Sequence, residues 1–386
     1  MALEATPAAR PRLRSLDLVR GVVMVLMAVD HVRVYSGVPA GGRTAGVFFT
    51  RWITHFCAPV FVFFAGSAAY LHGRKLGSRA LLAQYLVTRG LLLVVLELTV
   101  IRASWTFGFD YSAFLLAGVI WMLGWCMVLL AALVWLPTWT IGTVGVLTVL
   151  LQSAAAMVGR ALPESWWWLW EFIYPVGVEV TLGPDGPSVA VLYSIVPWIG
   201  VMAAGYAFGS IMTREPAARH RWCLRVGLAA VALFVLGAAI QATMMSGGEN
   251  PAPFWFRFLN QQKYPASPLF LLMTLGPAIA LLPAAERMRG WVADGLVTFG
   301  RVPMFYYLLH IPLIHLSALL VWYLRDGRFG EDRFATAPYV SLPPPERWSL
   351  LLLYLVVLID VALLYVACRW FAEVKGRSRS KWLQYL

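Results

Sequence analysis

The chain of 386 residues is 60% hydrophobic and only 13% charged, and its mean hydropathy is +0.71. Soluble globular proteins carry about 25% charged residues, so this composition excludes an ordinary soluble fold and indicates that lipid is the main solvent. The net charge of +12 does not indicate nucleic-acid binding, because the basic residues flank apolar runs, as topogenic charges do. We therefore expect membrane lipid, and no nucleic acid, among the partners of the protein.

Apolar runs long enough to cross a bilayer follow one another along the chain. A membrane helix needs about 20 mostly apolar residues, and this rule predicts an all-α fold with about ten transmembrane helices. In chain order, the expected spans are 16–35, 48–71, 81–101, 114–135, 139–157, 191–212, 226–244, 268–285, 302–324 and 350–371.

Basic residues are concentrated in every second connection between these runs. They are concentrated before the first span and in the segments HGRKLGSR, TREPAARHRWCLR, ERMRG and KGRSRSK. Because Lys and Arg accumulate on the cytoplasmic side, about ten spans would place both termini in the cytoplasm. The first run is too long for the apolar part of a signal peptide, so we expect a retained span. No repeat or soluble stretch interrupts the series, and we expect one membrane domain over residues 1–386.

Ionisable residues gather near the outer ends of the first two spans. Asp30, His31 and Arg33 close the first span, and Arg51 and His55 stand four apart on one face of the second. A charge at the centre of a bilayer costs about 3 kcal/mol or more, so such side chains usually face the protein interior. Because the two spans are antiparallel neighbours, we expect these five residues to form one cluster.

This cluster contains the groups that acyl transfer needs. Histidine exchanges its proton near neutral pH, and a neighbouring carboxylate fixes its tautomer. It can deprotonate a hydroxyl or an amine, or it can take the acyl group itself. We predict that His31 is the catalytic residue, that Asp30 orients it, and that His55 is the second choice. The structural alternative is that His31 forms only a hydrogen-bonded helix end.

Seven further residues are candidates for substrate binding, because arginine and other cationic groups near either face suit an anionic donor. They are Arg20, Arg33, Arg51, Lys263, Arg301, His310 and His315. His310 and His315 have a structural alternative as buried polar contacts between helices. Arg20 has one as well, since it stands one turn from Asp17 and can form an ion pair with it.

The cysteines and histidines do not indicate a metal centre. The four cysteines are widely spaced and form no CxxC pair, so neither a disulfide framework nor a zinc site is expected. A metal site built from Asp30, His31 and His55 is an alternative, but the sequence has neither HxxxH nor HExxH spacing. We therefore expect no metal.

The segment RSLDLVRGVVMVLMAVDH, residues 14–31, resembles the opening of the heparan-α-glucosaminide N-acetyltransferase catalytic-domain family. The spacing of Arg20 and His31 also resembles that of an arginine and a histidine in the first span of bacterial envelope O-acyltransferases. Four later segments resemble the bacterial branch of the first family. They are RWITHFCAPVFVFFAG, YSIVPWIGVMAAGYAFG, KYPASPLFLLMTLGPA and FGRVPMFYYLLHIPLIHL.

The resemblance implies an acyltransferase of the bacterial inner membrane. Its donor would be cytoplasmic acetyl-CoA or another acyl-CoA, and its acceptor a sugar or glycan outside. His31 matches the polar catalytic position of the first span. The heparan enzyme also uses a histidine between its first two spans, and this sequence has none between His31 and His55, so the role stays open between these two. The sequence leaves a homodimer open as well.

A different class of function is a proton-coupled transporter or flippase for an envelope precursor. Buried charges, spans interrupted by proline and a histidine near the middle of the membrane suit such a protein. The inverted repeat typical of many transporters is not visible in the sequence, so the acyltransferase is the preferred hypothesis.

Overall fold

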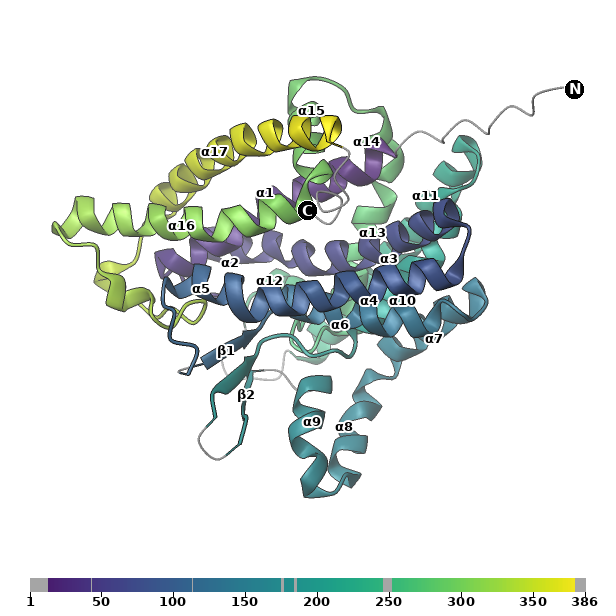
Figure 1. Cartoon of the computed structure of the whole chain (residues 1–386), viewed down its shortest axis with the longest axis horizontal. Helices are drawn as coiled ribbons and strands as arrows, with labels where there is room; N and C mark the ends of the chain where they lie inside the picture. Colours follow the sequence, from purple (N-terminus) through teal and green to yellow (C-terminus); the bar gives the residue numbers. More distant parts are fainter. Residues whose placement is uncertain are drawn as a thin grey trace, which may run out of the picture.

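The computed structural model describes residues 13–42, 44–112, 114–174, 177–183, 186–245 and 252–378. The protein is mainly helical, with 76% helix and 3% strand. Figure 1 shows the long helices running side by side, with a small sheet at one end of the bundle and α8 and α9 projecting away from it.

The helices follow one another along the described chain in a fixed order. They are α1 (Arg14–Ser36), α2 (Ala45–Trp52), η1 (Ile53–Phe56), α3 (Cys57–Leu76), α4 (Arg79–Leu96), η2 (Glu97–Ile101), α5 (Arg102–Thr106), α6 (Val119–Leu133), α7 (Thr138–Leu150), α8 (Gln152–Ala161), η3 (Glu164–Trp166), α9 (Trp167–Ile173), α10 (Trp198–Met212), α11 (Pro216–Met244), α12 (Phe254–Leu259), α13 (Pro268–Ala280), α14 (Leu282–Arg287), α15 (Trp291–Arg301), α16 (Pro303–Asp326), η4 (Glu331–Phe334), η5 (Pro344–Glu346) and α17 (Leu350–Arg377).

Several of these helices have the length and composition of membrane spans. Within the described residues, five helical stretches qualify by themselves: Ala45–Leu76, Pro216–Met244, Pro268–Arg287, Pro303–Asp326 and Leu350–Arg377. A sixth is added if α7 and α8, which meet at a bend of 66°, form one broken span. The chain is therefore a multi-pass membrane protein, but the prediction of about ten spans is not confirmed.

The remaining predicted spans correspond to helices that are shorter or more polar. α1 is 23 residues long, but Asp17, Arg20, Asp30 and Arg33 set it apart from the apolar spans. α6 and α10 are apolar but have only 15 residues each. Residues 1–12 and 379–386 lie outside the described part of the chain, so the cytoplasmic location of both termini stays a prediction.

The fold departs from the all-α prediction in a small three-stranded sheet. β1 (Phe114–Ala117) pairs in parallel with β3 (Ser188–Val191), and β3 pairs antiparallel with β2 (Val178–Thr181). The expected spans 114–135 and 191–212 therefore begin with strand residues, and their helices start only at Val119 and Trp198. A short apolar run fits a buried strand as well as the start of a helix, which explains the difference.

Glycines allow the helices around the site to pack with their backbones in contact. A Cβ atom on Gly21 of α1 would lie 1.8 Å from the carbonyl oxygen of Leu296 in α15. A Cβ atom on Gly300 of α15 would lie 1.8 Å from the carbonyl oxygen of Asp17 in α1. Small residues permit such close approach between membrane helices, so this pair fixes α1 against α15.

A buried carboxylate holds the start of α6. Glu97, at the beginning of η2, is 1% exposed, and its Oε2 atom accepts hydrogen bonds from the backbone N–H groups of Ile120 at 2.9 Å and Trp121 at 3.3 Å. The first N–H groups of a helix have no partner within it, and a carboxylate satisfies both them and the positive end of the helix dipole. Glu97 therefore has a structural role as the cap of α6.

Candidate active site

The imidazoles of His31 in α1 and His310 in α16 form the centre of the candidate site. The Nδ1 atom of His31 lies 2.7 Å from the Nε2 atom of His310, and the rings stack with their centroids 4.8 Å apart. His310 is fully buried, whereas His31 is half-buried. The two histidines that the sequence places in different spans therefore share one hydrogen bond.

The backbone of α16 determines the direction of this hydrogen bond. The Nδ1 atom of His310 lies 2.7 Å from the carbonyl oxygen of Tyr307 and 3.2 Å from that of Tyr306. A carbonyl oxygen only accepts, so Nδ1 of a neutral His310 carries the proton and its Nε2 has a lone pair. His31 must then donate from Nδ1, which leaves its own Nε2 as the unprotonated nitrogen.

Aromatic side chains from the neighbouring elements hold the ring of His31. Trp105 of α5 meets it edge to face with a centroid distance of 4.8 Å. Tyr35, one turn further along α1, stacks on Trp105 at 5.6 Å and donates a hydrogen bond of 2.6 Å to its carbonyl oxygen. His31 thus lies between α5 and α16 within the protein rather than on its lipid-facing surface.

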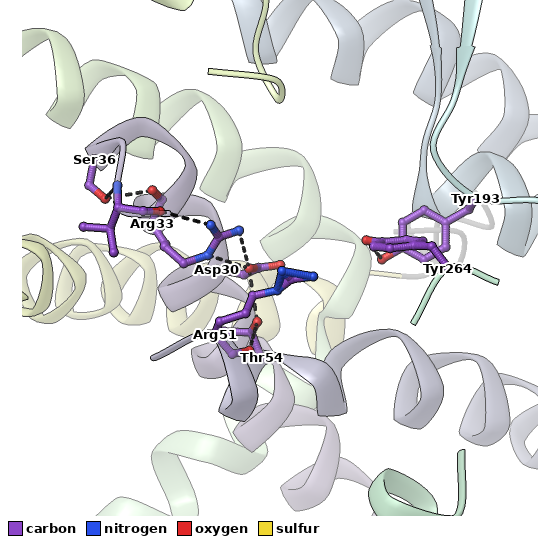
Figure 2. Close-up of polar contacts among 8 residues, drawn as sticks. Asp30, Arg33, Ser36, Arg51, Thr54, Tyr193 and Tyr264 are labelled. Carbon is purple, nitrogen blue, oxygen red and sulfur yellow. Dashed lines mark hydrogen bonds and ion pairs between the residues drawn. The ribbon is translucent and has the colours of Figure 1, made fainter. Parts of the chain in front are cut away.

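Asp30 joins two segments of the chain through its carboxylate. Its Oδ1 atom accepts from Nη2 of Arg33 at 3.1 Å and from the hydroxyl of Thr54 at 3.1 Å. Arg33 also donates to the carbonyl oxygen of Val38 at 3.2 Å. Figure 2 shows the Arg33 guanidinium next to Asp30, with Thr54 below the carboxylate. The hydrogen bond of the His31 ring is made with His310, and the orienting role of Asp30 stays a prediction.

A cavity of about 640 Å³ opens beside this cluster, and the structure places several predicted residues in its wall. Arg51 of α2, His55 of η1 and Lys263 line it together. His55 is 5% exposed, and its Nδ1 atom has no hydrogen-bond partner among the described residues. Its ring meets Phe270 edge to face at 5.4 Å. His55 is thus a wall residue of this cavity.

Lys263 is held by aromatic rings. The side chain is 6% exposed, and its Nζ atom lies 5.0 Å from the ring centre of Tyr264 and 5.7 Å from that of Tyr193. The hydroxyl of Tyr264 donates to that of Tyr193 at 3.3 Å. Figure 2 shows these two tyrosines on the side of Asp30 toward which the Arg51 side chain points.

Three predicted residues lie elsewhere. Arg20 is near the other end of α1, where it donates to the carbonyl oxygen of Phe64 at 3.0 Å and pairs with Asp17 at 3.8 Å. Arg301 is exposed at the end of α15. His315 stacks on Phe107 with centroids 3.9 Å apart and on Tyr35 at 4.9 Å, and its Nδ1 atom lies 3.3 Å from the carbonyl oxygen of Ser104.

Several residues that shape the site carry no signal in the sequence. Trp105 and Thr54 are ordinary residues in membrane helices, and nothing in their local pattern marks them. The carbonyl groups of Tyr306 and Tyr307 act through the backbone, which the identity of a side chain does not reveal. Within the described residues, no three or more His, Cys, Asp or Glu side chains are grouped as a metal site would require.

Comparison with known protein families identifies the family of the chain. The model of the family described as heparan-alpha-glucosaminide N-acetyltransferase, catalytic, matches residues 12–240, which is more than half of the chain. The match includes α1, with His31, and η1, with His55, and it ends before Lys263 and His310. A search of curated proteins returned no match. The chain is thus a multi-pass membrane protein that belongs to the heparan-alpha-glucosaminide N-acetyltransferase catalytic-domain family.

Proposed function

We propose that the protein transfers an acetyl or other short acyl group from cytoplasmic acyl-CoA to a sugar or glycan on the outer side of the bacterial inner membrane. The observation that carries this proposal is the hydrogen bond of 2.7 Å between His31 and His310. It leaves Nε2 of His31 without a proton on a half-buried ring, in a chain that belongs to an acetyltransferase family. A nitrogen in this state is what a general base or an acyl carrier requires.

In the direct reaction, Nε2 of His31 acts as the general base. It takes the proton from the hydroxyl or amine of the acceptor while the acceptor oxygen or nitrogen attacks the thioester carbonyl carbon. The carbon–sulfur bond then breaks, and the coenzyme A thiolate takes the proton from the imidazolium of His31. His310 keeps the Nδ1–H of His31 engaged throughout, so Nε2 is the nitrogen that gains and loses the proton.

In a two-step reaction, the same nitrogen acts as a nucleophile. Nε2 of His31 forms a bond to the thioester carbonyl carbon, and coenzyme A leaves as the thiol with the proton of the medium. The acceptor then attacks the carbonyl carbon of this acyl-imidazolium, and the bond from that carbon to Nε2 breaks. The proton of the acceptor passes to the medium, which leaves the neutral ring. Both routes use the same atom, and they differ in whether an acyl-histidine exists before the acceptor arrives.

The length of α1 supports a donor that stays on the cytoplasmic side. Arg20 precedes His31 by 11 residues, which corresponds to about 16 Å along a helix. We assign Arg20 and the exposed Arg301 to the approach of the coenzyme A phosphates, because guanidinium groups bind phosphate well. The pantetheine arm would then carry the thioester toward His31.

Transfer across sealed vesicles tests this proposal. The purified protein is reconstituted, acetyl-CoA labelled in the acetyl group is supplied on one side, and amino sugars or neutral sugars are enclosed on the other. The proposal expects label on the enclosed sugar. Uptake or release of a solute without any transfer of label would support a transporter and overturn the proposal.

A further inference from the structure

We infer that the cavity of about 640 Å³ lined by Arg51, His55 and Lys263 binds an acidic sugar through its carboxylate or phosphate group. The inference rests on the proposed function, because it assigns this cavity to the acceptor. It adds what that function leaves open, namely the chemical class of the acceptor.

The charge of the cavity wall indicates an anionic ligand. Arg51, Arg257 and Lys263 line it, and the described residues of the wall include no aspartate or glutamate. Arg257 donates to the backbone carbonyl groups of Ala242 and Ala252, which are uncharged. Among the described residues, Lys263 contacts aromatic faces and forms no ion pair. Lys263 is buried and the two arginines are half-buried, and the nearby carboxylate of Asp30 is already paired with Arg33. The positive charge of the wall therefore favours an oxyanion as ligand.

Buried polar atoms in the same wall have no partner within the described chain. They are Nε of Arg51, Nδ1 of His55 and Oε1 of Gln261. His55 is 5% exposed and Gln261 only 3%. Leaving a buried polar atom unsatisfied is unfavourable, and such atoms usually pair with a ligand or with water. The first two atoms can donate a hydrogen bond and the glutamine oxygen can accept one, so the residues of the wall have unused polar groups.

The other residues of the wall suit a sugar ring rather than a bare anion. Trp52, Phe256 and Tyr264 present aromatic faces, and Asn260 and Gln262 present amides. Aromatic faces cover the apolar side of a pyranose, and amides match its hydroxyl groups because they both donate and accept. A volume of about 640 Å³ lies within the usual range for small-molecule sites and exceeds what an inorganic ion requires.

One hydrogen bond joins the segment that carries His55, a residue of the cavity wall, to the segment that carries His31. Thr54 donates to Asp30 at 3.1 Å, His55 follows Thr54 in η1, and His31 follows Asp30 in α1. His55, which lines the cavity, and His31, which would perform the chemistry, therefore lie on two segments that this hydrogen bond joins. The inference requires that a sugar held by its anionic group in the cavity brings a second group toward His31.

Binding of three matched sugars to the full-length protein tests the inference. Saturation-transfer NMR or calorimetry compares D-glucuronate, D-glucose 1-phosphate and D-glucose, without acyl-CoA. We expect at least one anionic sugar to bind about 10-fold or more tightly than glucose, which corresponds to one charge-assisted contact. Preference for glucuronate identifies a carboxylate ligand, and preference for glucose 1-phosphate identifies a phosphate ligand.

Variants link the preference to this cavity. Lys263→Met and Arg51→Gln should each remove most of the 10-fold preference, whereas Lys263→Arg should keep it because the charge remains. Arg160→Gln, which changes an exposed arginine at the end of α8, is the matched control and should bind like the parent. Variants are compared only if they elute as the parent does in size-exclusion chromatography.

The result that overturns the inference is equal binding of all three sugars, or a preference that survives both charge-removing variants. This outcome differs from failure of the proposed function. Binding is measured without the donor, so a protein that prefers anionic sugars but transfers no acetyl group contradicts only the proposed reaction. A protein that transfers acetyl groups but shows no preference contradicts only the acidic acceptor.

Discussion

The Nδ1 atom of His31 lies 2.7 Å from the Nε2 atom of His310, although 279 positions separate the two residues in the chain. The carbonyl oxygens of Tyr306 and Tyr307 fix which nitrogen of His310 carries its proton. Through that ring they also fix the tautomer of His31. A backbone feature of α16 thus determines which nitrogen of α1 is available for chemistry.

His310 is therefore predicted to be a positioning residue. Replacing it with leucine removes the acceptor for Nδ1–H of His31, so the other tautomer becomes accessible and kcat should fall about 10²-fold. His310→Gln keeps an oxygen acceptor and should recover part of the loss. The measurement is steady-state acetyl transfer by both variants. Because a positioning residue does not contact the acceptor, KM for the acceptor should change little, and a rise in KM at constant kcat would contradict the assignment.

Asp30 is predicted to stabilise the C-terminal end of α1. Its removal leaves Arg33, which is 9% exposed, without its carboxylate, and breaking such a buried pair costs about 3–5 kcal/mol. Asp30→Ala should therefore lower the thermal stability strongly. Thr54→Val removes only one hydrogen bond to Asp30 and should cost about 1 kcal/mol. Thermal unfolding in detergent measures the loss of stability in both variants. Equal stability of Asp30→Ala and the parent would contradict the prediction.

Gly300 is predicted to be essential for packing α15 against α1. A Cβ atom there would lie 1.8 Å from the carbonyl oxygen of Asp17, so the helices must separate in Gly300→Ala. Overpacking of this kind costs about 1–3 kcal/mol or more. Gly295→Ala is the control on the same helix, because its Cβ would lie 3.6 Å from a Tyr365 ring atom. Thermal unfolding should show a loss for Gly300→Ala and none for Gly295→Ala.

Glu97 is predicted to act through its hydrogen bonds to the start of α6. Glu97→Leu leaves the N–H groups of Ile120 and Trp121 buried without an acceptor, which costs about 1–3 kcal/mol. Glu97→Gln keeps one side-chain oxygen as an acceptor, so we expect it to lose less stability than Glu97→Leu. The free energy of unfolding of the two variants checks this order, and a glutamine variant as unstable as the leucine variant would show that the charge matters more than the hydrogen bonds.

The sequence predicts the helices best where an apolar run is long. The expected span 16–35 corresponds to α1 at Arg14–Ser36, and 350–371 corresponds to α17 at Leu350–Arg377. The prediction from the sequence fails where an apolar run includes a strand before the helix begins. Phe114–Ala117 is as apolar as the helix that follows, so hydropathy does not separate β1 from α6. Only the partner strand β3, from a distant part of the chain, determines that structure.

The sequence predicts which residues belong to the site better than it predicts which of them contact each other. Isolated ionisable groups within apolar runs indicate His31, His55 and His310, because each is expensive to place in lipid. Which of them meet depends on how α1 and α16 pack, and the sequence contains no local signal for that. The adjacent Asp30 was the natural partner for His31 by position, yet its carboxylate turns to Arg33 and Thr54.

The catalytic role of His31 is tested most directly by single-turnover transfer with this residue changed. The purified protein, His31→Gln and His72→Gln are mixed with labelled acetyl-CoA and acceptor, quenched, and analysed for label on acceptor and protein. His72, near the end of α3, is the matched control. We predict that His31→Gln loses transfer by about 10²-fold or more while it stays folded, and that His72→Gln keeps the parent rate. Parent-like transfer by a folded His31→Gln variant would contradict the central claim.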